Sequence, residues 1–64
     1  NKDRVLPLVR MILRCGVFEL MVLMETPTPV VISEYVKLAE LFFDEPEKKL
    51  VHALLDKIAK EIRA

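Results

Sequence analysis

The stretch that decides the fold is residues 7–24, PLVRMILRCGVFELMVLM, in which Arg10, Arg14 and Glu19 are the only charged residues. This stretch is far longer than a usual β-strand, and Met, Leu and Arg favour helix, so we predict a helix over its whole length. A helix that is apolar on nearly every side is normally buried among other helices. Something outside this helix must therefore cover it.

Three residues in this helix each predict a local feature of its structure. Pro7 is expected to begin it, because a missing N–H and a fixed φ suit the first helical position. Gly16 costs about 1 kcal/mol relative to Ala in a helix, and its missing side chain would let another helix approach closely. Cys15 lies among apolar neighbours and is expected to be a small, inert core residue.

Two amphipathic helices are predicted after the first. The sequence TPTP before the second helix is typical of an extended turn, in which Thr28 would cap the helix. Asp44 and Glu47 have the spacing of a capping box at the start of the third helix. The expected fold class is therefore all-α, with three helices over residues 7–24, 29–43 and 46–63, in one small domain.

Composition and charge exclude several classes of protein. A single Cys allows no internal disulfide, and no Cys and His residues have the spacing of a zinc site, so no metal or other cofactor is expected. A formal net charge of zero argues against binding to nucleic acid by bulk electrostatics alone. The charge is uneven, however, because both ends of the chain are basic and residues 19–47 carry seven acidic groups and one basic group.

A membrane span and a catalytic site are not expected either. Residues 7–24 are the most membrane-like stretch, but each of their three charged side chains costs roughly 2.5–3.5 kcal/mol at a bilayer centre. No secretory signal is visible, so a cytoplasmic location is the expectation. Glu34 has no His, Cys or second acid at a supporting spacing, and we therefore expect no catalytic residue and no enzyme.

Three segments together carry a family resemblance. The sequence VRMILRCGVFEL at 9–20 contains Ile-Leu-Arg, a small residue and an aromatic-Glu-Leu. Pro27 and the sequence TPVVISEYVKLAELFF at 28–43 match in part a pattern of a Pro, a Val-x-Ile-Asn-Glu and a Leu-Ala. The segment KKLVHALLDKIAKEIR at 48–63 partly matches a closing Phe-Val-Asn-Gly-x-Leu-Asp-Lys. In this order and without a gap, the segments resemble the C-terminal half of NusB-type transcription antitermination factors.

The chain departs from the family pattern at three places. Ser33 stands where the family has Asn, Leu50 where it has an aromatic residue, and His52-Ala53 where it has Asn-Gly. The fold does not depend on these residues. Recognition of RNA is affected by such changes, because a Leu side chain cannot form a hydrogen bond with a base.

The resemblance implies an all-helical protein longer than this chain. Its members bind boxA-type RNA through an arginine-rich N-terminal segment, and act with the ribosomal protein NusE in the RNA polymerase antitermination complex. On this interpretation the N-terminal half is absent here. The first helix would then be a central helix that lacks its neighbours.

Candidate RNA-binding residues lie at the start of the third helix. Lys48, Lys49 and His52 fall within its first turns, where they would form either a small RNA-facing patch or an ordinary solvated face.

Candidate partner-binding residues are Arg10, Phe42 and Pro46. Phe42 matches the family's aromatic residue, and large aromatic side chains are good interface anchors, whereas Phe43 is then expected in the core. Arg10 and Arg14 lie one turn apart and would contact a phosphate or the acidic middle segment, although we favour a solvated edge of the helix.

Two alternative functions remain open at this point. A NusB-like RNA-binding domain of an rRNA cytosine methyltransferase would share the helical fold but continue into a catalytic domain. A helical self-association module would bury the first helix against a second copy of the chain, making a homodimer. The contact in that homodimer is expected at Leu13, Val17, Leu20 and Met24.

Overall fold

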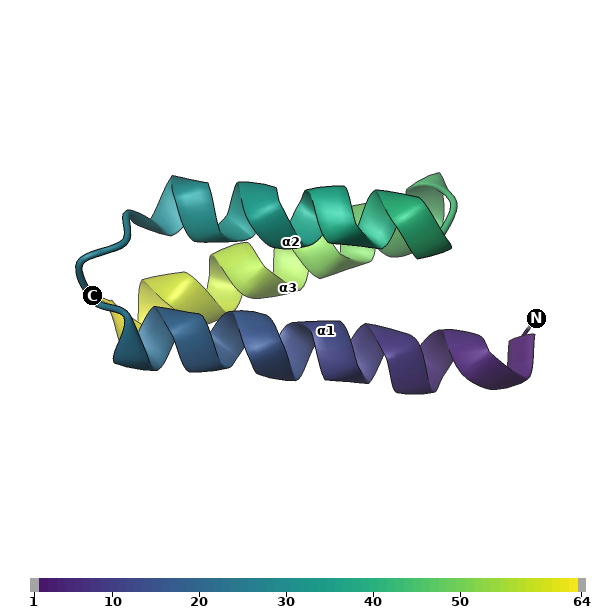
Figure 1. Cartoon of the computed structure of the whole chain (residues 1–64), viewed down its shortest axis with the longest axis horizontal. Coiled ribbons are helices and arrows are strands. Elements are labelled where there is room, and N and C mark those ends of the chain that lie inside the picture. Colours follow the sequence, from purple (N-terminus) through teal and green to yellow (C-terminus); the bar gives the residue numbers. More distant parts are fainter. Residues whose placement is uncertain (1, 64) are drawn as a thin grey trace.

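The computed structural model describes residues 2–63, and the side chains of residues 3–63, as three helices joined by two short turns (Figure 1). The helices are α1 (Lys2–Val22), α2 (Thr28–Phe42) and α3 (Glu45–Ile62). α2 runs back along α1, and α3 turns back again, so that the end of α3 lies beside the end of α1 (Figure 1). Each helix packs against both of the others. The predicted fold class, all-α with three helices, is confirmed.

α1 begins at Lys2 rather than at Pro7, so the predicted start of this helix is wrong. Pro7 lies in the second turn of α1, where it removes the hydrogen bond that its N–H would donate to the Asp3 carbonyl, so other contacts must offset this loss. Asp3 also suits the positive end of the helix dipole. Val5 packs against the core. This tertiary contact extends α1 past the boundary that Pro7 indicated.

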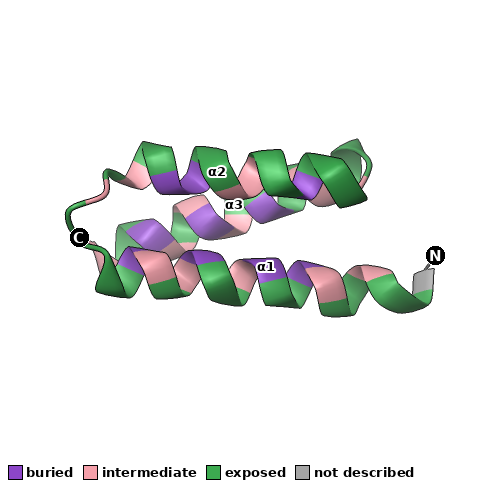
Figure 2. Ribbon diagram, viewed as in Figure 1, coloured by how far each residue is buried: buried purple, intermediate pink, exposed green. Residues whose placement is uncertain are grey.

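Each helix contributes one stripe of apolar side chains to a shared core (Figure 2). The stripe in α3 repeats every four residues, as expected for one face of a helix. No polar or charged residue is buried among the described residues. The buried core consists of Val9, Ile12 and Leu20 from α1, Val31, Ile32 and Ala39 from α2, and Val51, Leu55 and Ala59 from α3.

Gly16 on α1 lies directly against Leu55 of α3. A Cβ atom placed on Gly16 would lie 2.8 Å from Cδ2 and 3.2 Å from Cδ1 of Leu55. Leu55 is completely buried, so its side chain has little freedom to move aside. The prediction that Gly16 permits the close approach of another helix is confirmed.

The two turns differ from the predicted capping pattern. Pro27 rather than Thr28 precedes α2, and the Thr28 hydroxyl accepts a hydrogen bond of 3.2 Å from Arg63. Asp44 does precede α3, but its side chain makes no capping hydrogen bond. Its carbonyl oxygen instead accepts a hydrogen bond from the Lys48 N–H, at 3.1 Å. Neither α2 nor α3 therefore begins with the expected side-chain cap.

Only one side of α1 is covered by α2 and α3. Cys15 lies outside the buried stripe of α1 and is exposed, so the prediction that it is a core residue is wrong. Its apolar sequence neighbours misled the prediction, because residues adjacent in sequence point in different directions on a helix. Among the helices of residues 2–63, none has the length and apolar character needed to cross a bilayer.

Candidate interaction surfaces

The outer side of α1, turned away from α2 and α3, is largely exposed (Figure 2). It carries an open apolar groove. Phe18 and Met21 are 62% and 58% exposed there, although both side chains are large and apolar. Exposed apolar surface gathered on one face marks an interaction site. The groove, which we call the α1 groove, is lined by Arg10, Leu13, Arg14, Val17, Phe18 and Met21.

The predicted set of docking residues on α1 is only partly available. Leu20 is completely buried in the core, so it cannot contact a partner. The helical rotation of about 100° per residue places Leu20 on the same face as Val9 and Ile12. Leu13 and Val17 are half-buried and line the groove, and Met24 is exposed in the turn that follows α1.

Arg10 and Arg14 are both exposed on the α1 groove. Within residues 3–63 neither forms an ion pair, so the pairing with the acidic middle segment that the sequence suggested is not seen. Their guanidinium groups therefore place positive charge on the rim of an otherwise apolar groove.

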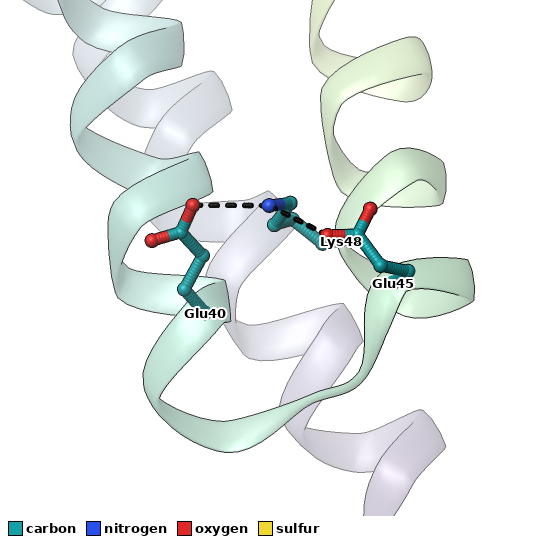
Figure 3. Close-up of polar contacts among 3 residues, drawn as sticks. All are labelled: Glu40, Glu45 and Lys48. Carbon is teal, nitrogen blue, oxygen red and sulfur yellow. Dashed lines mark hydrogen bonds and ion pairs between the residues drawn. The ribbon is translucent and has the colours of Figure 1, made fainter.

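Lys48 connects α2 to α3 through two carboxylates (Figure 3). Its Nζ atom lies 3.0 Å from a carboxylate oxygen of Glu40 and 3.0 Å from one of Glu45. Hydrogen bonds to these carboxylates raise the pKa of Lys48, and the hydrogen bond from Lys48 lowers the pKa of Glu45. The charge of Lys48 is thus balanced within the chain.

The other two predicted RNA-binding residues, Lys49 and His52, are exposed on α3. Because the Lys48 side chain reaches towards α2, the three predicted residues do not form one free basic cluster (Figure 3). RNA binding by Lys49 and His52 stays a prediction.

His52 also lines a pocket between α2 and α3, together with Ser33 and Asp56. Ser33 and His52 are two of the three places where the chain departs from the family pattern. The sequence shows both departures but cannot show that Ser33 and His52 share a pocket, because they lie far apart along the chain and no sequence pattern links them. The remaining lining residues are Thr28, Pro29, Ile32 and Val36.

Tyr35 joins α2 to α1 beside Glu19. Both residues are half-buried. Burial raises the pKa of the Tyr35 hydroxyl well above its ordinary value of 10.0, and a hydrogen bond with the Glu19 carboxylate raises it further. The neutral phenol is therefore the form that suits this site.

Arg63 is the residue that sequence reasoning missed. Its guanidinium donates hydrogen bonds to the carbonyl oxygens of Leu20 (3.0 Å), Leu23 (3.0 Å) and Thr26 (2.6 Å), as well as to the Thr28 hydroxyl. The carbonyl of Leu20 belongs to the last turn of α1, where carbonyls have no helical partner. Arg63 thus fastens the end of α3 to the end of α1 and to the turn before α2.

Phe42 and Pro46 lie on either side of the turn between α2 and α3, and both are exposed. Phe43 packs against the core, as expected if only one of the two aromatic residues is buried. The two rings lie 6.3 Å apart between centroids. Partner binding by Phe42, Pro46 and Arg10 stays a prediction.

Among residues 3–63, no three His, Cys, Asp or Glu side chains are grouped in a way that would hold a metal ion.

The comparisons with known proteins agree on one family. The model of the NusB family matches residues 1–60. The transcription antitermination protein NusB of Rhizobium etli (strain CIAT 652) is 54% identical over 56 residues, which are 88% of this chain and 35% of that protein. The protein of the same name from Sinorhizobium medicae (strain WSM419) is 51% identical over 55 residues, which are 86% of this chain and 34% of the relative.

The chain therefore spans about a third of the length of the curated relatives it matches. No solved structure matches it significantly. The family match nevertheless covers nearly all of the sequence, including most of all three helices. On this evidence the chain belongs to the NusB family.

Proposed function

We propose that this chain is part of a cytoplasmic transcription antitermination factor that binds boxA-type RNA together with the ribosomal protein NusE, within the RNA polymerase antitermination complex. The observation that carries the proposal is the 54% identity, over 88% of the chain, with a protein named for transcription antitermination. Because the relatives described above are named as antitermination proteins, we favour a binding role over the methyltransferase alternative and over an enzyme of any kind.

For RNA contact we propose Lys49 and His52 as the free groups, with Lys48 as the residue that positions their helix. Lys49 and His52 lie three residues apart on α3 and are both exposed, so their side chains project from nearly the same face. Lys48 is held by Glu40 and Glu45. It would fix the start of α3 against α2 rather than contact a phosphate.

For protein contact we propose the surface around Phe42 and Pro46, with Arg10 as a separate contact on α1. Phe42 is 58% exposed at the end of α2, which is unusual for a large aromatic side chain unless a partner covers it. Pro46 is exposed in the first turn of α3 and adds a rigid apolar surface nearby.

An electrophoretic mobility-shift assay tests the proposal, using the chain within its complete protein, NusE and boxA RNA. We expect a ternary complex on boxA RNA and none on a scrambled RNA of equal length. Lys49→Gln should weaken the complex and reduce the slope of log affinity against log salt by about 1, as expected for one lost phosphate contact. The matched control is Lys37→Gln, which removes an exposed lysine from α2.

Absence of a ternary complex would contradict the antitermination role. Equal weakening by Lys49→Gln and Lys37→Gln would contradict the assignment of the RNA face to α3. Transfer of a methyl group to rRNA cytosine by the complete protein would favour the methyltransferase alternative instead.

A further inference from the structure

The pocket between α2 and α3 combines apolar walls with three polar side chains. Ser33 comes from α2, and His52 and Asp56 lie four residues apart on α3. Ile32 and Val36 are among the apolar residues of its walls. Its volume of about 360 Å³ falls within the range of small-molecule sites, about 300–1,000 Å³. The pocket can therefore hold one planar ring that both packs on apolar side chains and forms hydrogen bonds.

The polar lining limits what can occupy this pocket. Among the described residues, none from α1 lines it, so the pocket is separate from the α1 groove. Within residues 3–63, neither the Ser33 hydroxyl nor the His52 imidazole has a hydrogen-bond partner in another side chain. An apolar segment laid over the pocket would bury these groups without partners, which opposes binding. An occupant with its own donors and acceptors suits the pocket better.

Positive charge lies on both sides of the pocket along α3. Lys49 is exposed one turn before His52. Lys60 lines a neighbouring pocket that shares Asp56 with the first. The two lysines are 11 residues apart in the sequence, or about 17 Å along the helix. A strand of a few nucleotides can therefore place phosphates at both lysines while one of its bases enters the pocket.

We propose that the pocket holds one base of a single-stranded RNA, and that Asp56 selects a base with an exocyclic amino group: adenine, cytosine or guanine. This inference rests on the proposed antitermination role and adds a base-reading subsite to it. The Oδ2 atom of Asp56 lies 3.2 Å from the Nζ atom of Lys60, which leaves Oδ1 to accept a hydrogen bond from the amino group. His52 lies one turn away, where its ring can stack on the face of the base.

Uracil is the base that this site disfavours. Its Watson–Crick edge carries two carbonyl oxygens and no amino group, whereas adenine, cytosine and guanine each carry an amino donor. A carbonyl oxygen beside the Asp56 carboxylate would place two acceptors together with no hydrogen between them. Replacing the bound base with uracil should therefore weaken binding about ten-fold.

Base substitution in the RNA tests the inference, in an anisotropy titration of labelled boxA RNA with the complete protein and NusE. Each adenine, cytosine and guanine is replaced in turn by uracil. We expect one position at which uracil weakens binding about ten-fold and at which Asp56→Asn removes this loss, because an amide can also donate to a carbonyl oxygen. The matched control is Glu61→Gln, which changes an exposed acid of α3 outside both pockets and should leave the loss unchanged.

Chemical modification tests whether the pocket is open in the complete protein. His52 is the only histidine of this chain, so mass spectrometry can locate its reaction with diethyl pyrocarbonate. We expect His52 to react in the complete protein and to be protected when NusE and boxA RNA are bound.

Several outcomes would overturn the inference. An unreactive His52 in the absence of RNA would mean that another part of the protein covers the pocket. Identical uracil losses in the native protein and in Asp56→Asn would exclude base reading by Asp56 and leave the antitermination role intact. Binding of free AMP or CMP as tight as that of the RNA would assign the pocket to a soluble nucleotide instead. Absence of any complex on boxA RNA, in contrast, would contradict the antitermination role itself.

Discussion

Replacing Arg63 with Met is the most direct test of how the three helices are held together. Met keeps an unbranched apolar side chain but removes every donor of the guanidinium. Arg63 donates to the carbonyl oxygens of Leu20, Leu23 and Thr26 and to the Thr28 hydroxyl, at 2.6 to 3.2 Å. The variant therefore removes the only hydrogen bonds described between the end of α3 and the end of α1.

The size of the effect follows from the exposure of these contacts. A hydrogen bond from a charged donor contributes about 1.5–3 kcal/mol, but an exposed acceptor regains most of this from water. The contact with Leu23 is exposed, whereas those with Leu20 and Thr26 are partly buried. Counting the two partly buried carbonyls at a reduced value gives a loss of about 2–3 kcal/mol in the free energy of unfolding.

Thermal unfolding followed by circular dichroism measures this loss. For a domain of this size, 1 kcal/mol corresponds to about 4–8 °C in Tm, so Arg63→Met should lower the Tm by at least about 8 °C. Arg63→Lys should fall between the two proteins, because a single ammonium group cannot reach all the carbonyls that the planar guanidinium reaches. All proteins must be compared at one concentration, since dimer formation would shift the Tm.

Lys60→Met is the matched control at the same end of α3. Lys60 is 78% exposed and pairs with Asp56 at 3.2 Å, four residues earlier on the helix. An exposed pair of this type contributes about 0.3–0.5 kcal/mol. If Arg63→Met lowered the Tm no more than Lys60→Met does, the idea that Arg63 fastens α3 to α1 would be refuted.

Three further predictions follow from the packing and electrostatics. Gly16→Ala gains about 1 kcal/mol in helix propensity but loses about 1–3 kcal/mol by crowding Leu55. Urea unfolding should therefore show an unchanged or lower free energy of unfolding. A higher free energy of unfolding would mean that a methyl group fits between α1 and α3. Tyr35 is the only tyrosine and there is no Trp, so ultraviolet absorbance reports the ionisation of Tyr35 alone. Tyr35 should ionise well above pH 10 in the folded chain and near pH 10 in the urea-unfolded chain. Glu19→Gln should lower the pKa of Tyr35 in the folded chain. Because the unfolded chain loses this proton first, stability should fall as the pH rises above about 10, and identical titrations in the two states would contradict the site. Lys48→Met should return the pKa of Glu45 towards its ordinary 4.5 in an NMR titration, and an unchanged pKa would mean that the ion pair is absent in solution.

The fold class was predictable because its signals are local and repeated. Amphipathic spacing in residues 29–43 and 46–63 and the long apolar run before them predict three helices. Gly16 was interpretable as well, since a glycine inside an apolar helix has few purposes other than close approach. The start of α1 was not predictable from Pro7 alone, because the packing of Val5 decides it.

The surface residues were harder to assign. Composition alone could not show that Leu20 is buried and Phe18 exposed, because both sit in a helix that is apolar on nearly every side. Only the packing of α2 and α3 against α1 determines which face of α1 is buried. The role of Arg63 could not be predicted, since its acceptors are mainly backbone carbonyls, which every residue carries whatever its type.

The Arg63 contacts also bear on the order of folding events. Short turns between neighbouring helices favour rapid assembly, whereas the bond from Arg63 to Leu20 closes a loop of 43 residues. We expect a contact of this kind to form only after the helices have met, and therefore to be absent from the transition state for folding. Its removal should therefore accelerate unfolding and leave the refolding rate nearly unchanged.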